Sequence, residues 1–116
     1  MKIVLSAKDK APGSEVDPRF GRAAFLLVFD TTSEAWESVD NASAMSAAHG
    51  AGIQAAETAC RLGAGAVISG HVGPKAFSVL SAGGVKVYRG DARTALEAVE
   101  AFRRGQLPEL SGSNGP

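Results

Sequence analysis

Residues 66–88, AVISGHVGPKAFSVLSAGGVKVY, predict a strand, a helix and a second strand in immediate succession. Ala66–Ser69 is a short apolar run, and Pro74–Ala82 has a proline suited to a first helical turn and two glycines after its end. Val85–Tyr88 is the second strand. A crossover of this kind is right-handed, so its two strands run parallel in one sheet. The stretch therefore predicts an α/β domain.

The segments before and after this unit complete the sheet and add two helices. In chain order, they are strands at Lys2–Ala7, Ala24–Asp30 and Ala35–Asp40, a helix at Gly50–Leu62, and a last helix at Ala92–Arg104 that Asp91 can cap. The first three strands form a meander, and right-handed crossovers make the first, fourth and fifth strands parallel. We expect a five-stranded mixed sheet in the order 3-2-1-4-5, with strand 2 antiparallel and three helices. This is a ribonuclease H-like arrangement.

Length and composition indicate one small domain with an ordinary core. The chain has 116 residues, of which 45% are hydrophobic and 21% are charged, a balance typical of globular proteins. We expect a single domain over residues 1–107 and a flexible C-terminal tail over residues 108–116. Basic and acidic residues are equal at 12 each, so there is no overall positive charge to favour nucleic acid as a partner.

The chain contains one cysteine, Cys60, which excludes intramolecular disulfides and multi-thiolate metal sites. It shares an apolar helical stripe with Ile53 and Ala56, ~15 Å from the helix start, so we interpret it as a buried structural thiol. No apolar run approaches the roughly 18 residues of a membrane-spanning helix. We therefore expect a cytoplasmic protein that does not bind a membrane.

One edge of the predicted sheet collects most of the residues that could bind a ligand. Ligands of α/β sheets sit outside the carboxyl ends of the strands, where connections diverge. Two helices also begin there, and their free N–H groups favour anions. The candidate residues are Arg19, Arg22, His49, Gly50, Gly52, Gly70, His71, Gly73 and Lys75. They suit an anion with soft or nitrogen-seeking metal centres, and the two histidines, His49 and His71, are the candidate metal ligands.

Each candidate also has a purely structural interpretation. The two arginines can form surface ion pairs with Glu15, Asp17 or Asp91. Phe20, which lies between them, is expected to anchor the loop on the core. The two histidines can be a solvated residue before a helix and a turn residue. The glycines can serve the turns alone.

Three motifs resemble a known protein family. They are FGRA at Phe20–Ala23, GAGIQAAE at Gly50–Glu57 and GHVGPKAF at Gly70–Phe77. In this order and spacing, the chain resembles the dinitrogenase iron–molybdenum cofactor biosynthesis family, of the NifX and NifB C-terminal domain type, over residues 1–107. Within that family it is similar in kind to the orange proteins, which hold a molybdenum–copper sulfide cluster without covalent attachment.

The resemblance implies a cluster-binding protein and not an enzyme. We expect it to bind, carry or deliver an anionic metal–sulfur cluster, either a molybdenum–copper sulfide or a related iron–molybdenum–sulfur cluster. A protein donor or recipient of the cluster would be its partner. Many relatives have asparagine at the position of His71 and glycine at that of His49. The resemblance therefore assigns neither histidine as a ligand.

Functions of other classes fit the residues less well. A nuclease of the ribonuclease H-like type needs clustered carboxylates near the first strand, and Lys2–Ala7 contains none. The run GAGIQA at Gly50–Ala55 resembles a dinucleotide-binding fingerprint, but no strand leads directly into it and position 70 is glycine where an acid is needed. The remaining alternative is a protein-interaction or regulatory module with no bound cluster.

Overall fold

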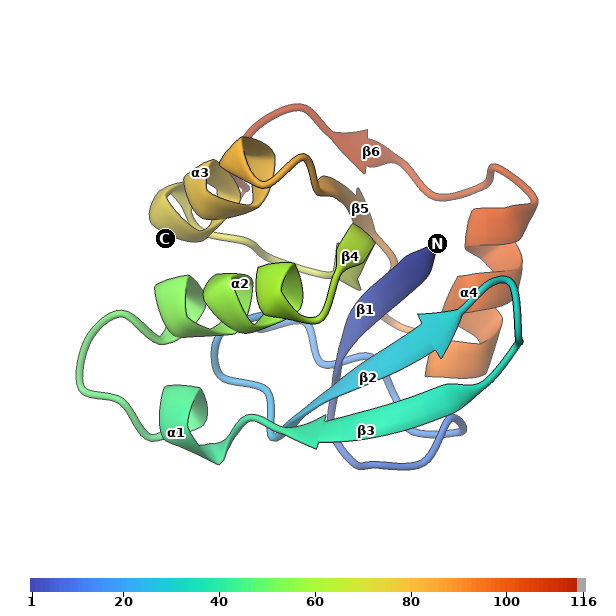
Figure 1. Ribbon diagram of the computed structural model, residues 1–116, viewed down its shortest axis with the longest axis horizontal. Helices are drawn as coiled ribbons and strands as arrows, with labels where there is room; N and C mark the ends of the chain where they lie inside the picture. The colour runs from blue at the N-terminus through green and yellow to red at the C-terminus, as the bar shows by residue number, and fades with distance from the viewer. Residues whose placement is uncertain (115–116) are drawn as a thin grey trace.

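A computed structural model describes residues 1–114 of the chain. In chain order, its elements are β1 (Lys2–Ala7), β2 (Phe25–Asp30), β3 (Trp36–Asp40), α1 (Ala42–Met45), α2 (Ala51–Arg61), β4 (Ala64–Ser69), α3 (Pro74–Ala82), β5 (Lys86–Arg89), α4 (Ala95–Arg103) and β6 (Glu109–Leu110). The strands form one sheet in the order β3-β2-β1-β4-β5-β6 (Figure 1).

Strand β1 lies at the centre of the sheet and sets the direction of its neighbours. It pairs antiparallel with β2, with Lys2 opposite Asp30 and Ala7 opposite Phe25. On its other side it runs parallel to β4, and β4 runs parallel to β5. Strand β3 pairs antiparallel with β2. The predicted order of the first five strands and the reversed direction of strand 2 are therefore confirmed.

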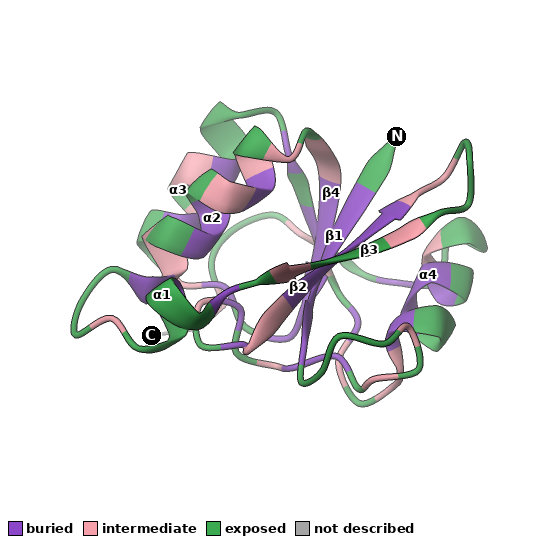
Figure 2. Ribbon diagram, turned by 60° about the horizontal axis from the view of Figure 1, so that its bottom comes forward, coloured by how far each residue is buried: buried purple, intermediate pink, exposed green. Residues whose placement is uncertain are grey.

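Helices cover both faces of the sheet, which explains why the central strands are mostly apolar. Successive residues of β1 face opposite sides. Val4 belongs to a core that includes residues of α2 and α3, whereas Ile3 and Leu5 belong to a second core with residues of α4. Figure 2 shows α2 and α3 on one side of the sheet and α4 on the other. Within residues 1–114, none of the helices is long and apolar enough to cross a membrane.

The structure corrects the predicted number of elements. Residues 1–114 form six strands and four helices, where we expected five strands and three helices. The additional strand, β6, pairs antiparallel with β5, with Leu110 opposite Val87, and it lies in the segment that we expected to be a tail. The additional helix, α1, is a single turn before α2. Elements of two and four residues are too short for hydrophobic periodicity to reveal. Residues 115–116 of the expected tail lie outside the described residues.

Asp91 does not cap the last helix, contrary to the prediction. The Thr94 hydroxyl accepts a hydrogen bond from the Glu97 N–H at 3.2 Å, and the Glu97 carboxylate accepts one from the Thr94 N–H at 2.8 Å. Ala92 has a φ of 64°, a left-handed conformation that no right-handed helix contains. The helix therefore begins only after this residue, and Asp91 instead forms an ion pair with Arg89 at 3.1 Å.

Candidate functional site

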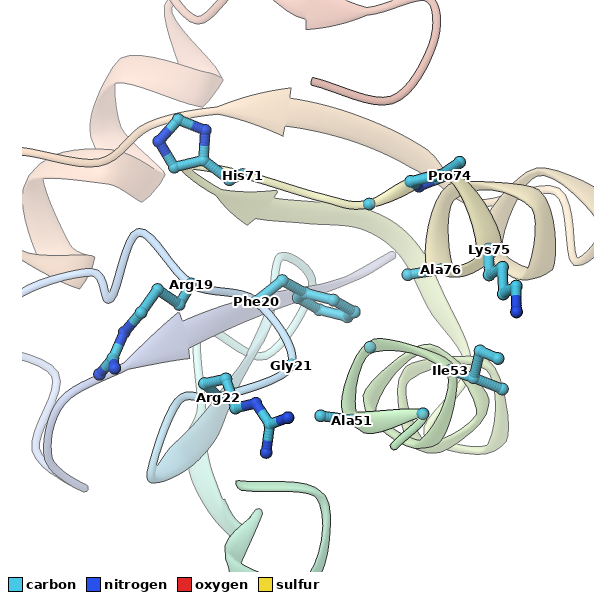
Figure 3. Close-up of a pocket in the computed structure, with 13 residues that line it drawn as sticks. Arg19, Phe20, Gly21, Arg22, Ala51, Ile53, His71, Pro74, Lys75 and Ala76 are labelled. Carbon is cyan, nitrogen blue, oxygen red and sulfur yellow. The ribbon is translucent and has the colours of Figure 1, made fainter. Parts of the chain in front are cut away.

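A cleft of about 660 Å³ opens where the loops after β1 and β4 meet the first turns of α2 and α3 (Figure 3). This is the edge of the sheet at which the sequence predicted a binding site. Most of the predicted residues line the cleft, namely Arg19, Arg22, Gly50, Gly52, His71, Gly73 and Lys75. The remaining lining residues are Phe20, Gly21, Ala51, Ile53, Pro74 and Ala76.

Buried hydrogen bonds hold the loop after β1 against the ends of the strands. The Asp17 N–H donates to the Ser6 carbonyl at 2.9 Å, and the Asp17 carbonyl accepts from the Ser6 hydroxyl at 2.7 Å. The hydroxyls of Ser6 and Ser69 are themselves 2.7 Å apart, which joins β1 and β4 at this edge. All three residues are buried, and a buried polar group without a partner costs about 1–3 kcal/mol. The fold itself therefore fixes the loop that contains both arginines.

Phe20 and Gly21 bring this loop into contact with α2. Phe20 is only 2% exposed and packs in the core beneath α2 and α3, as expected for a loop anchor. A Cβ on Gly21 would lie 2.5 Å from the backbone nitrogen of Gly52. This distance leaves no room for any side chain, so only glycine allows the two backbones to approach so closely. The contact forms one wall of the cleft.

Helices α2 and α3 both begin at the cleft without a capping side chain. Gly50 precedes α2 with a φ of 74°, and Gly73 precedes α3. Neither first turn contains an acidic residue. The helices also lie close together, since a Cβ on Gly52 would be only 3.2 Å from the Ala76 Cβ. Free N–H groups and the partial positive charges of two helix starts therefore converge on one space.

The two arginines have different hydrogen-bond partners: Arg19 binds a carboxylate and Arg22 binds backbone carbonyls. Arg19 Nε and Nη2 each lie 3.3 Å from a carboxylate oxygen of Asp17, and this hydrogen bonding raises the pKa of Arg19 above its ordinary value. Arg22 Nη1 instead donates to the carbonyls of Met45 and Ala47, at 3.0 and 2.6 Å. A guanidinium has more donors than two carbonyls use, so Arg22 retains N–H groups for a ligand. Figure 3 shows Arg22 directed toward the start of α2, whereas Arg19 points away from it.

The lining contains no carboxylate and has a substantial apolar part. Lys75 forms no ion pair with any residue among 1–114, and its position in the first turn of α3 is unfavourable beside the partial positive charge there. A bound anion would relieve that repulsion. Phe20, Ile53 and Pro74 add apolar surface. The combination suits a large, weakly hydrated anion better than a small, strongly hydrated one.

Of the two histidines, His71 lines the cleft and His49 does not. The Nδ1 of His71 lies 3.3 Å from the Asn114 carbonyl oxygen, and His49 is exposed in the segment before α2. Gly70 is also outside the cleft, because it is buried against Pro18, where a Cβ would lie 2.7 Å from the proline Cα. Across residues 1–114, no group of three or more His, Cys, Asp or Glu side chains could hold a metal ion.

Cys60 lies at the interface between α2 and α3, at the end remote from the cleft. A Cβ on Gly83, the residue after α3, would be 2.8 Å from its sulfur atom, and the sulfur is 4.0 Å from the Val79 carbonyl. The thiol packs against the core but is only partly buried, where we expected full burial. Its position near the exposed end of α2 accounts for the difference. The position agrees with a structural role.

The sequence matches the profile of the dinitrogenase iron-molybdenum cofactor family over residues 1–105. The chain belongs to this family. The family membership that the three motifs predicted is therefore confirmed.

Solved structures and a further protein sequence are similar to this family member over nearly its whole length. The apo form of the orange protein from Desulfovibrio gigas is 43% identical, with a TM-score of 0.94, and the match covers 97% of this chain and 95% of that one. A Thermotoga protein described as a NifB-type member of the DUF35 family is 35% identical, with a TM-score of 0.85, and the match covers 97% of this chain and 96% of that one. An uncharacterized protein from Methanocaldococcus jannaschii is 28% identical over 113 residues, which are 95% of this chain and 92% of its own.

The apolar residues of the cleft were not predicted from the sequence. Ile53, Pro74 and Ala76 lie in first turns of helices, where apolar side chains are ordinarily interpreted as core. A signal was nevertheless present, because Gly50 and Gly73 each precede a helix and lack a capping side chain. The residues that directly follow an uncapped helix start must lie beside any ligand bound there.

Proposed function

We propose that this member of the family binds and carries an anionic metal–sulfur cluster in the cleft, without catalysing a reaction. The cluster is cargo, either a molybdenum–copper sulfide or a related iron–molybdenum–sulfur cluster, received from or passed to another protein. Membership of the iron–molybdenum cofactor family and the similarity to the orange protein support this proposal. We also propose that the fold is ribonuclease H-like, on the basis of the order of its first five strands.

The observation that carries the proposal is the cleft's combination of positive charge, free backbone donors and apolar surface with no carboxylate in its lining. In a thiometallate cluster, sulfide already saturates the metals, so the protein need not supply a thiolate. The negative charge is spread over large, weakly hydrated sulfur atoms. Arginine matches such a surface well because its guanidinium is planar and weakly hydrated. Backbone N–H groups add several weak hydrogen bonds at once.

Anaerobic equilibrium dialysis against tetrathiomolybdate with Cu(I), followed by metal analysis and visible spectroscopy, tests this function. We expect the protein to retain molybdenum and copper and to gain a charge-transfer band. Arg22→Ala should weaken binding by about 1–2 kcal/mol, the range for a charge-assisted hydrogen bond. Arg104→Ala is the matched control, because Arg104 pairs with Glu100 at 3.0 Å at the end of α4, on the opposite face of the sheet.

The possible results separate the cluster carrier from its alternative. If the anaerobic protein retains no molybdenum, copper or iron, the cluster-carrier proposal is wrong, and a protein-interaction or regulatory module becomes the better interpretation. If Arg104→Ala weakens binding as much as Arg22→Ala, the anion binds the protein surface non-specifically and the cleft is not its site.

A further inference from the structure

The loop between β4 and α3, residues 70–73, contributes His71 and Gly73 to one wall of the cleft and is held from two sides. On the inner side, the His71 N–H donates to the Pro18 carbonyl at 2.6 Å, and the Phe20 N–H donates to the His71 carbonyl at 3.3 Å. These bonds join the wall to the loop that contains the two arginines. On the outer side, Asn114 is the residue that holds the wall, among residues 1–114.

Asn114 uses all of its polar groups on this wall. Its side-chain Nδ2 donates to the Gly70 carbonyl at 2.8 Å, and its Oδ1 accepts from the Val72 N–H at 2.9 Å. Its backbone N–H donates to the Val72 carbonyl at 3.1 Å. Its carbonyl oxygen lies 3.3 Å from Nδ1 of His71. Strand β6 brings the chain to this place, and Figure 1 shows the segment after β6 running toward α3.

The contact with Asn114 selects one tautomer of His71. A backbone carbonyl can only accept a hydrogen bond, so Nδ1 of His71 must be the donor. In the neutral ring, the proton is then on Nδ1, and Nε2 keeps its lone pair.

We infer that Asn114 is a positioning residue of the cleft, which holds the loop at residues 70–73 and fixes the position and tautomer of His71 beside the bound cluster. The inference rests on the proposed function, because it takes the cluster as the ligand of the cleft. It adds the segment after β6 to the site, although none of residues 111–114 lines the cleft.

Nuclear magnetic resonance of the cluster-free protein tests the inference without any ligand. Long-range ¹H–¹⁵N spectra, recorded where the ring is neutral, should show His71 protonated on Nδ1. Asn114→Ala removes the two side-chain hydrogen bonds that hold the segment on this loop. The backbone carbonyl of residue 114 should then move away from the ring, and the ring should revert toward the Nε2–H tautomer that free histidine prefers in water. The Val72 amide should also exchange its hydrogen faster, because it loses its acceptor. Ser113→Ala, a change at the exposed neighbouring residue, should leave both signals as in the wild type.

Cluster titration of the same proteins tests the link to binding. Asn114→Ala should weaken cluster binding about fivefold, the equivalent of roughly one hydrogen bond, because the loop must be ordered when the cluster binds. Ser113→Ala should bind as the wild type does. A wild-type ring protonated on Nε2, or a tautomer unchanged in Asn114→Ala, overturns the inference. Equal cluster affinity in the two variants also overturns it. If the wild type retains no cluster, the proposed function fails, and the tautomer result still decides whether Asn114 positions His71.

Discussion

At the scale of single residues, the cleft depends on a close approach between the backbones of Gly21 and Gly52. A side chain at Gly21 would meet the Gly52 nitrogen at 2.5 Å, so Gly21→Ala must push the loop away from α2. We expect the free energy of unfolding to fall by about 1–3 kcal/mol, as for other overpacked sites. Gly13→Ala is the control, because nothing lies within 4 Å of a Cβ there. Urea unfolding of both variants measures the difference, and equal stabilities would contradict the close approach.

Asp17 neutralises part of the positive charge beside the cleft. Its side chain is 4% exposed, whereas that of Arg19 is 66% exposed. The backbone N–H of Arg19 donates to Asp17 Oδ1 at 2.9 Å. Asparagine at position 17 keeps an oxygen that can accept this hydrogen bond, but it removes the negative charge. Asp17→Asn should therefore bind the cluster up to about fivefold more tightly, the range of an exposed ion pair. Dialysis at one fixed ionic strength measures this, and weaker binding would show that the carboxylate is needed to orient Arg19.

The charged residues of the cleft could be predicted from the sequence, but their partners could not. Arg19 pairs with Asp17, one of three acids considered, because Asp17 is held at the strand ends by Ser6. Arg22 donates to backbone carbonyls of the segment around α1. Every residue has a backbone carbonyl, so the sequence does not indicate which one an arginine contacts. Which partner a surface arginine finds depends on the path of the loops, and that path is set by buried contacts far along the chain.

At the scale of elements, the start of α4 should make stability depend on pH. The hydrogen bond from the Thr94 N–H lowers the pKa of Glu97 below its ordinary value of 4.5. A carboxyl group with a lowered folded-state pKa stabilises the fold above its unfolded-state pKa, and this contribution is lost as the pH falls through the folded-state value. Wild type should therefore be more stable than Glu97→Gln at neutral pH, with the gap closing at acidic pH. A gap in urea midpoint that is the same at every pH would contradict this.

The interface between α2 and α3 provides a test of the role of Cys60. The thiol packs beside Gly83, at the end of the helix pair remote from the cleft. Cys60→Ala should lower the free energy of unfolding by about 1 kcal/mol or less, since it leaves a small and partly exposed cavity. Cluster affinity, measured by dialysis, should be unchanged. Loss of the cluster from a variant that remains folded would show that the sulfur is a ligand.

Helices and strands with a clear hydrophobic pattern or clear end signals could be predicted from the sequence, whereas short elements without such a pattern could not. Lys2–Ala7 and Pro74–Ala82 match their expected bounds, because apolar runs, proline and glycine mark both. Strand β6 forms by pairing with the free edge of β5. This pairing depends on the folded sheet and not on the local sequence. Asp91 was a plausible cap by residue type, but the positive φ of Ala92 separates it from the helix. Local residue type could not show this backbone turn.

At the scale of the whole molecule, a neutral protein has a locally positive cleft. Basic and acidic residues are equal in number, yet the lining of the cleft contains Arg19, Arg22 and Lys75 and no carboxylate. Asp17, behind the lining, offsets only Arg19. The fold achieves this separation by bringing two uncapped helix starts and the loop after β1 to one edge of the sheet. The molecule should therefore attract anions through one site and not through its net charge.

This separation of charge predicts that salt weakens cluster binding. Exposed charges are screened over about 10 Å at 0.1 M salt and over shorter distances at higher salt, so affinity measured by dialysis should fall steadily as ionic strength rises. The double variant Arg22→Ala/Lys75→Ala should bind more weakly and depend less on salt, because less charge remains to be screened. A histidine that coordinates a metal would behave differently. If salt has no effect and His71→Ala alone abolishes binding, the cluster is held by coordination, and the electrostatic account of the cleft is wrong.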